Sequence, residues 1–195
     1  MPKVTHEYRD ARRDQILSAA RRCFLRNGFH ATSMQDLFAE SGLSSGAVYR
    51  YFASKDDMII AIAEENMRDV VAMIHDVAGS QPGRPVGTVL ADIVKMLQAK
   101  DTEDGLAGLA LLAWSESLRN PVLARRYADL FAQIHADLTE IARKHQRAGN
   151  LPRQVSAEAL AAVFLSIVPG CILQRATLGP AAVEGVPAAV EALWP

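Results

Sequence analysis

The sequence predicts an all-α protein in which a small N-terminal head of three helices is joined by one long helix to a larger C-terminal helical body. Two observations support this fold class. Apolar residues recur at spacings of three and four along nearly the whole chain, and no stretch alternates strictly over the length of a strand. One clear cluster of helix-breaking residues, at 79–85, separates the head and its connecting helix from the rest.

The first predicted helix covers residues 9–27. Ile16, Leu17 and Phe24 share one of its faces, which is expected to be buried, and Gly28 follows its end as a C-cap. Its other face is basic and carries Arg12, Arg13, Arg21, Arg22 and Arg26.

Two short helices separated by a glycine-containing turn complete the predicted head. Residues 32–35, Thr-Ser-Met-Gln, have the form of a capping box, so a helix is expected to begin there and to end near Glu40. After the turn at 41–43, Ser44 or Ser45 caps the third helix. A long helix followed by two short ones around such a turn is the arrangement of a helix-turn-helix reader of DNA.

The rest of the chain is predicted to be helical as well. Residues 54–57, Ser-Lys-Asp-Asp, cap a long fourth helix that reaches about Val77. Further helices are expected over 86–99, 103–118, 121–148, 156–178 and 181–193. We therefore expect two units, a helix-turn-helix domain at 1–54 and a helical body at 55–195.

Composition excludes several classes of protein. The chain has 195 residues, a net charge of −1 and 50% apolar residues, which is unlike a disordered chain. Cys23 and Cys171 are too few for a disulfide framework and lack the C-x-x-C spacing of a metal or redox pair. The polar start lacks the apolar core of a signal peptide, so we expect a cytoplasmic protein. The longest uncharged run, 159–174, is shorter than the ~20 residues that a bilayer needs, which predicts no membrane segment.

The third helix carries the residues that point to DNA. Val48 and Phe52 are spaced i, i+4 and face inward, so polar and small residues face outward. Small residues let the backbone approach the major groove, Arg50 can reach guanine edges or phosphate, and Tyr49 can donate to phosphate. The head is also the basic part, because residues 1–55 hold 9 Lys and Arg against 5 Asp and Glu. Spacing alone leaves a second interpretation open, a three-helix packing unit with a solvated basic face.

Residues 42–55 read Gly-Leu-Ser-Ser-Gly-Ala-Val-Tyr-Arg-Tyr-Phe-Ala-Ser-Lys and follow a Thr-capped helix in register. Upstream stand Asn27-Gly28-Phe29 and Ala31-Thr32-Ser33-Met34. This pattern, over about residues 12–60, resembles the DNA-binding head of TetR-family transcriptional regulators. The resemblance implies an all-helical homodimer with a DNA reader in each subunit, and a C-terminal body that binds a small ligand and pairs through its last two long helices.

The resemblance also assigns DNA contacts by position. It implies that Thr32 and Ser33 touch phosphate, that the third helix lies in the major groove, and that Lys55 clamps the DNA backbone. The third-helix contacts are Ser44, Ser45, Gly46, Ala47, Tyr49 and Arg50. One position departs from the family, because Phe38 stands where a small residue is usual. We expect Phe38 to alter the packing of the first two helices and to leave the outward face intact.

The body offers candidates for a ligand cavity. Apolar residues at helical spacing can line a cavity or fill a core, and both interpretations remain open at this point. Trp114 is the best single candidate, because its ring pairs a large apolar surface with one N–H donor. The ligand-contact candidates are Met96, Trp114, Phe131, Ile134, His135, Phe164, Ile167 and Cys171. His135 and His145 are ten residues apart, which does not place them on one helical face, so no metal site is predicted.

Dimerisation is predicted from the helix at 156–178. It is apolar on nearly all sides, so one face can pack on its own body while the other needs a partner. Small residues such as Ala161 and Ala162 allow a close approach of helices. A second copy of the chain would supply the cover.

These features predict a dimeric, ligand-responsive DNA-binding regulator. We expect a repressor that leaves a pseudo-palindromic double-stranded operator when a small, largely apolar molecule binds the body, and we expect no cofactor. The alternative is a helical small-molecule carrier without specific DNA binding. An enzyme is not expected, because neither a nucleophile and base set nor a phosphate loop is present and no catalytic residue is predicted.

Overall fold

The computed structural model describes residues 6–79 and 84–195, and within these ranges the secondary structure is helical, with connecting turns and no strand. The polar start and the middle of the breaker cluster, at 1–5 and 80–83, lie outside the described residues. The helices are α1 (His6–Asn27), α2 (Met34–Ser41), α3 (Ser45–Tyr49), α4 (Lys55–Gly79), α5 (Val86–Asp104), α6 (Leu106–Ser117), α7 (Pro121–Ala148), α8 (Ala157–Leu178), a 3₁₀ turn η1 (Pro180–Val183) and α9 (Val186–Leu193). The predicted all-α architecture is confirmed.

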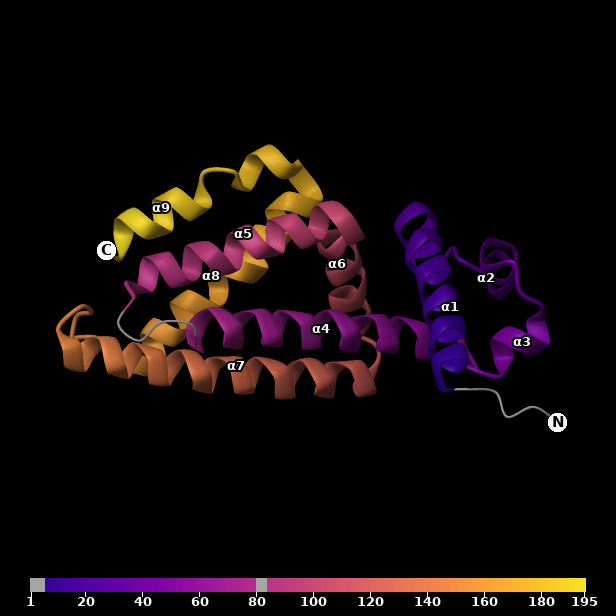
Figure 1. The fold of residues 1–195 in the computed structure, drawn as a ribbon, viewed down its shortest axis with the longest axis horizontal. Coiled ribbons are helices and arrows are strands. Elements are labelled where there is room, and N and C mark those ends of the chain that lie inside the picture. The colour runs from indigo at the N-terminus through magenta and orange to yellow at the C-terminus, as the bar shows by residue number, and fades with distance from the viewer. Residues whose placement is uncertain (1–5, 80–83) are drawn as a thin grey trace.

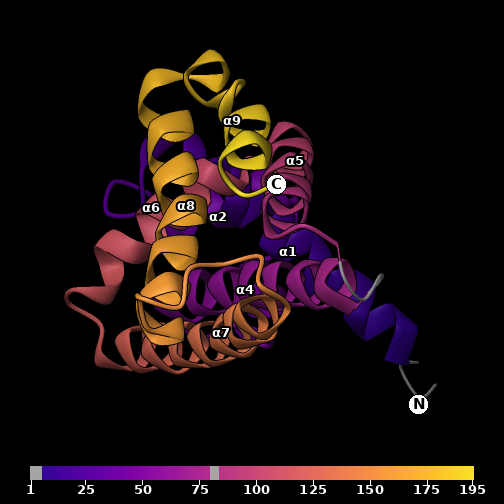
Figure 2. The ribbon, with the colours of Figure 1, turned by 90° about the vertical axis from the view of Figure 1, so that its left-hand side faces the viewer.

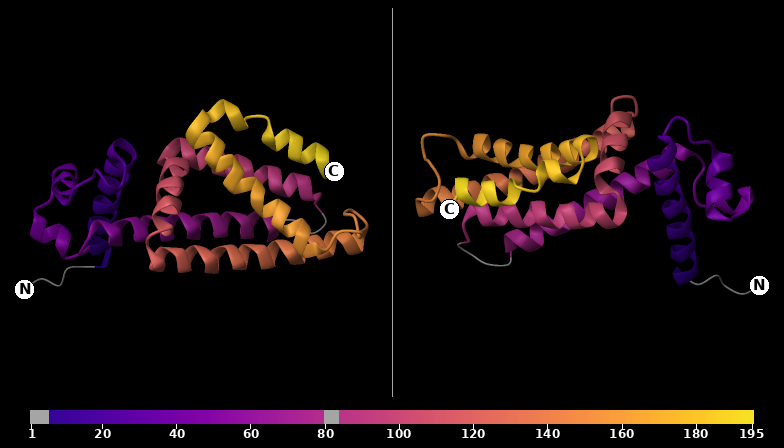
Figure 3. Two further views of the ribbon diagram at one scale, coloured as in Figure 1. Left: turned by 180° about the vertical axis from the view of Figure 1, so that it is seen from behind. Right: turned by 90° about the horizontal axis from the view of Figure 1, so that it is seen from above.

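The molecule is elongated, with α1, α2 and α3 gathered at one end and the body at the other (Figure 1). The helix α4 leaves the head and runs into the body, where it lies beside α7 (Figures 1 and 2). The helix α1 lies across the end of α4, as the view from above also shows (Figure 3). The long connecting helix is therefore the element common to both parts.

The head is held by a core that continues into the body. Phe24 of α1 and Val48 of α3 are completely buried, as is Ile62 of α4. The same apolar cluster extends to Leu109 of α6 and Leu123 of α7. The head and the body are therefore joined by one continuous buried core. The helix α4 contributes to this core where the two parts meet.

Local capping sets the ends of the two short helices. Ser33 is the N-cap of α2 and forms a reciprocal capping box with Asp36. The predicted box at 32–35 is therefore shifted by one residue, because Thr32 turns inward. Gly42 ends α2 in the left-handed conformation with φ 67°, which only glycine adopts without strain. Ser44 then caps α3 through the N–H of Ala47.

The body is layered around α4 and α7. The helix α8 crosses α7, and α5 pairs with α9 on the far side of the core (Figure 2). The pairing of α5 and α9 is close at Gly87, whose N–H donates to the carbonyl of Trp194 at 2.9 Å. A Cβ at Gly87 would lie 2.6 Å from that same carbonyl oxygen, so any larger residue would push α9 away.

The predicted body helices are present with different ends. The helix expected at 86–99 continues to Asp104 as α5 and is ended by Gly105 in the left-handed conformation, φ 67°. The helix expected at 103–118 begins after this glycine. The helix expected at 181–193 is divided into η1 and α9.

The helix α8 is the one described helix that is long and apolar enough to cross a membrane by length and composition. It packs against α7 and α6, with Leu160, Ala161 and Phe164 buried. Its other side is uncovered, since Val163 and Leu173 are each 50% exposed. One side of α8 is therefore packed in the body, and its other side is an exposed apolar face.

Candidate nucleic-acid interface and effector cavity

The outward face of α3 is open to solvent. Val48 is buried at the centre of the head, so its helix shows the opposite side to the surface. The predicted α3 contacts Ser44, Ser45, Gly46, Tyr49 and Arg50 are exposed, and Ala47 is half-buried. A Cβ placed on Gly46 would meet nothing within 4 Å. The face thus presents small residues and one aromatic and one cationic side chain, as a major-groove reader requires.

Phe38 contacts one member of this face. Its ring packs edge to face against Tyr49, with the two centroids 5.5 Å apart and an interplanar angle of 69°. The contact links α2 to α3, and Tyr49 is still 51% exposed. The expectation that Phe38 leaves the outward face intact stays a prediction.

Thr32 faces the interior of the head. Its side chain is 1% exposed, and its hydroxyl donates to the carbonyls of Gly28 at 2.7 Å and Cys23 at 3.3 Å. The predicted phosphate contact by this hydroxyl does not fit its position. Ser33 is exposed, but its hydroxyl is engaged with Asp36 in the cap of α2.

Lys55 has a different environment from the predicted DNA clamp. Its ammonium group donates to three carbonyls, those of Phe29 at 2.9 Å, His30 at 3.1 Å and Thr32 at 3.1 Å. The same nitrogen lies 4.7 Å from the centroid of the Phe29 ring. An ammonium group has three hydrogens, so these contacts occupy its donors. Lys55 thus ties the loop between α1 and α2 to the start of α4.

Most of the basic face of α1 is neutralised inside the head. Arg13 and Arg21 both pair with Glu65 of α4. Arg22 and Arg26 bind Glu40 of α2 at 2.7 Å and 3.1 Å, and their hydrogen bonds hold the pKa of the Glu40 carboxyl below its ordinary value. These ion pairs hold α1 against α2 and α4. The four arginines are therefore already engaged within the protein.

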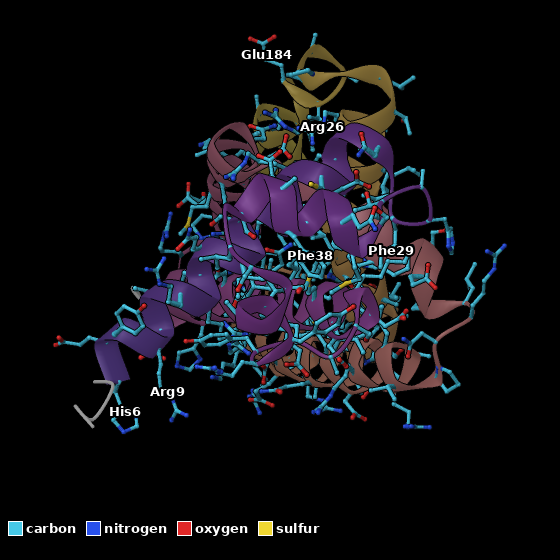
Figure 4. All side chains as sticks on the ribbon, turned by 90° about the vertical axis from the view of Figure 1, so that its right-hand side faces the viewer. His6, Arg9, Arg26, Phe29, Phe38 and Glu184 are labelled. Atoms are coloured by element: carbon cyan, nitrogen blue, oxygen red, sulfur yellow. The ribbon has the colours of Figure 1, made fainter. Side chains whose placement is uncertain are left out.

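Two exposed arginines of the head, Arg9 and Arg50, have no ion pair among the described residues. Arg50 lies at the C-terminal end of α3. His6 and Arg9 are exposed and lie at the N-terminal end of α1, away from Arg26 (Figure 4). The free positive charge of the head is therefore concentrated at α3 and at the beginning of α1.

The body contains a partly open cavity of about 70 Å³ between five helices. Its walls are almost entirely apolar. The lining residues are Ala63, Asn66, Met67, Val70, Ile74, Leu90, Ile93, Leu106, Ala110, Trp114, Tyr127, Leu130, Phe131, Ile134, Leu138, Phe164, Leu165, Val168, Pro169 and Ile172. Three of them offer polar atoms, the Asn66 amide, the Tyr127 hydroxyl and the Trp114 indole N–H. Among the residues that the structure describes, no charged side chain lines the cavity.

Four predicted ligand contacts line this cavity, namely Trp114, Phe131, Ile134 and Phe164. The other four lie elsewhere. Met96 is 37% exposed on α5, and the His135 ring nitrogen lies 3.1 Å from the carbonyl of Glu158. Ile167 packs in the core beside the cavity. Cys171 lines a separate, smaller hollow, and burial raises the pKa of its thiol.

Of the three polar members of the cavity, the sequence predicts Trp114 and misses Asn66 and Tyr127. Asn66 lies on α4, the predicted connecting helix, and Tyr127 lies on α7 between charged neighbours. Burial raises the pKa of the Tyr127 hydroxyl, which therefore stays protonated as a donor. In the described part of the chain, no group of three or more His, Cys, Asp or Glu residues is placed to hold a metal ion.

The cavity and the head meet through α6. Leu106 and Ala110 line the cavity, whereas Gly105 and Gly108 form a notch for Leu25 of α1. A Cβ on Gly108 would lie 2.7 Å from the nearest Leu25 methyl carbon. Farther along α6, the buried Glu116 lies 3.3 Å from the His30 ring of the head.

Comparison with known proteins identifies both parts of the chain. Residues 16–62 match the sequence model of bacterial regulatory proteins of the tetR family, and residues 88–193 match that of the C-terminal part of BetI-type transcriptional repressors. The chain belongs to the TetR family of transcriptional regulators. The second match covers more than half of its length, so membership extends well beyond the helix-turn-helix.

Individual relatives agree with this placement. A transcriptional repressor of Mycobacterium tuberculosis is 31% identical over 180 residues, which is 92% of this chain and 89% of the relative. The nicotine-responsive transcriptional repressor of Paenarthrobacter nicotinovorans is 28% identical over 166 residues, 84% of this chain and 82% of the relative. The structure of Salmonella enterica GusR superposes with a TM-score of 0.76 at 25% identity and covers 99% of this chain and 97% of GusR.

Membership of the TetR family confirms the resemblance found in residues 12–60. It also confirms the main functional prediction, a ligand-responsive DNA-binding regulator with a helix-turn-helix head. The family consists of transcriptional regulators and is not in general a family of enzymes.

Proposed function

We propose that this TetR-family regulator is a cytoplasmic homodimeric repressor that binds a pseudo-palindromic operator and is released by a small, largely apolar molecule. Residues 1–54 form the DNA-binding domain, and residues 55–195 bind the effector and the second subunit. No cofactor and no catalytic step enter this mechanism. The open face of α3, with Arg50 unpaired among the described residues, is the observation that carries the proposal.

The proposed DNA-binding residues fall into two groups. Exposed residues contact DNA directly, and residues that are bonded inside the head hold the exposed ones in place. Ser44, Ser45, Gly46, Ala47, Tyr49 and Arg50 present the reading surface, and Ser33 stands beside it at the N-terminus of α2. Thr32 and Lys55 support this surface from inside, through their bonds to the loop between α1 and α2. We assign them a positioning role.

The direction of regulation is proposed from the relatives. The repressor of Mycobacterium tuberculosis covers nearly the whole chain, and the relative from Paenarthrobacter nicotinovorans is a repressor that responds to a small molecule. The apolar cavity of this chain is suited to such control, because it lies against α4 and α6, both of which also contact the head.

The helix α4 supplies the proposed coupling. Its 25 residues span roughly 37 Å at 1.5 Å per residue. Ten residues after its first residue, Lys55, Glu65 binds Arg13 and Arg21 of α1, and the next residues, Asn66 and Met67, line the cavity. A ligand that favours one position of α4 therefore moves the head. Coupling of about 1–3 kcal/mol would weaken DNA binding roughly 5–150-fold.

The uncovered face of α8 supports the homodimer. Val163 and Leu173 are half-exposed on it. The predicted close-approach residue Ala161 is wrong, because it is completely buried in its own body, whereas Ala159 and Ala162 are exposed and leave room for close packing of a second α8. A dimer also gives the two α3 helices the two-fold symmetry that a pseudo-palindromic operator requires.

The deciding experiment measures binding of the purified protein to its own upstream DNA at fixed salt, against excess nonspecific duplex. Tight, competitor-resistant binding is expected. Binding no tighter than about 10⁻⁴–10⁻⁶ M, both to this DNA and to duplexes selected from a random library, would contradict the proposal and favour the carrier.

A further inference from the structure

The proposed effector cavity is too small to be a complete binding site. Its volume of about 70 Å³ is about half that of the ~150 Å³ engineered cavity that holds benzene. Binding sites for drug-sized molecules have about 300–1,000 Å³. An effector of that size must therefore extend beyond the cavity, and the question is in which direction.

A second hollow adjoins the cavity on the outside of the body. It is an open groove of about 760 Å³ between α4 and α7, which lie side by side (Figure 2). Met67 of α4 and Leu130 of α7 line both the groove and the cavity. These two side chains form the wall that the hollows share. Met67 has an unbranched, flexible side chain, so this wall can open by a change of rotamer.

The two hollows differ in chemistry. The cavity is apolar, whereas the groove carries polar and charged side chains on both of its helices, namely Glu64, Arg68, His75, Arg126, Asp129 and Gln133. Arg126 binds Glu64 at 3.2 Å across the groove. Arg68 and Asp129 have opposite charges and no ion pair within the described residues.

This charge pattern selects the kind of ligand. Two arginines face two carboxylates, so a ligand of either charge would meet both attraction and repulsion. An uncharged polar group can accept from the guanidinium groups and donate to the carboxylates. The cavity, which has no charged side chain, likewise disfavours an ion.

We propose that the effector is an uncharged amphipathic molecule whose apolar end enters the cavity past Met67 and Leu130 while its polar head stays in the groove between α4 and α7. The inference rests on the proposed function, because it completes the effector site of the body. It adds the groove between α4 and α7 to the effector site. It also makes this groove the route by which the effector enters the cavity.

Three probes with one chain and different heads test the ligand class. Hexanamide is uncharged, hexanoate is an anion at neutral pH and pentylamine, which has the same pentyl chain, is a cation. The Trp194→Phe variant leaves Trp114 of the cavity as its single indole, so its fluorescence reports binding there. We expect hexanamide to bind at least about tenfold more tightly than either ion. Lengthening the amide chain should strengthen binding about fourfold per methylene until the cavity is full.

Bulky labels on α7 test the route. Gln133→Cys places a thiol in the groove, and Arg125→Cys places one at an exposed position that lines neither hollow. Cys23 and Cys171 are buried, so a maleimide dye reacts first with the introduced thiol. The label at 133 should slow hexanamide association at least about tenfold, whereas the label at 125 should leave it unchanged.

The outcomes separate this inference from the proposed function. Equal association rates with the two labels would show that the effector enters by another route, which would overturn the proposed role of the groove. No binding of hexanamide up to about 10 mM would also overturn it, as would tighter binding of either ion. All of these measurements are made without DNA, so a failure to bind an operator contradicts the proposed function and leaves them unaffected.

Discussion

The head and the body differ in where their binding residues come from. In the head, the proposed reading face is built from one short stretch, residues 44–50, whose orientation is set by the caps Ser33, Gly42 and Ser44. In the body, the cavity is lined by five helices that are far apart in the sequence. A local surface is defined by residues that neighbour one another in the chain. A cavity is defined by how distant helices pack, and single positions say little about it.

The largest expected effect tests whether these two regions unfold separately. Phe24 in the head and Phe164 in the body are both 1% exposed or less. Replacing either by alanine should lower the free energy of unfolding by about 3–5 kcal/mol. Because one apolar cluster runs from the head into α6 and α7, we expect a single transition in urea, followed by circular dichroism, for both variants. Two resolved transitions would show that head and body are independent units.

Lys55→Met separates a structural lysine from a DNA-binding one. The variant loses three hydrogen bonds from a charged donor, so the free energy of unfolding should fall by about 1.5–3 kcal/mol. Urea titration measures this directly. A variant of unchanged stability whose salt dependence of DNA binding falls by about one unit would instead support the clamp on the DNA backbone.

Arg50→Ala tests the reading face itself. It should weaken specific operator binding by about 1–3 kcal/mol and leave folding and dimerisation intact, because Arg50 is exposed at the end of α3. Fluorescence anisotropy with labelled DNA at fixed salt measures the change. Arg125→Ala, at an exposed position of α7, is the matched control. Equal affinities of the two variants would remove α3 from the interface.

The smallest expected effect depends on pH. Arg22 and Arg26 lower the pKa of Glu40 below its ordinary value of 4.5, so the pairing stabilises the head above that pH. This contribution is lost as the pH falls through the lowered pKa of the folded protein. Glu40→Gln should therefore lower the urea midpoint at about pH 6, and the difference should shrink towards about pH 3. Glu7→Gln, at an exposed position of α1, should show neither change.

Local signals in the sequence predicted the fold well. Helical spacing and caps located all of the main helices, and Asn120 with Pro121 marks the start of α7 as the structure has it. The predicted helix ends are wrong where two neighbouring residues could each serve as the cap. Thr32 and Ser33 both suit an N-cap, and the choice depends on which hydroxyl finds carbonyls inside the head.

The candidate site was predicted less completely, for physical reasons. The resemblance to the family assigns Lys55 to the DNA backbone from its place in the motif alone. The direction of its side chain depends on the backbone carbonyls around its ammonium group, which the motif does not show. In the body, helical spacing shows that a residue is apolar and not which neighbour it faces, so Met96 and Ile167 were chosen beside Trp114 and Phe164. Asn66 was missed because one amide on a mixed helix gives no signal until a cavity forms around it.

The contact of Leu25 with α6 places one side chain of the head against a helix that also lines the cavity. One side of α6 borders the cavity through Leu106 and Ala110, and Gly105 and Gly108 leave room for the methyl groups of Leu25. Leu25 is 45% exposed and only the end of its flexible side chain makes this contact. A small shift of α6 can therefore be taken up by a change of the Leu25 rotamer before it reaches the backbone of α1.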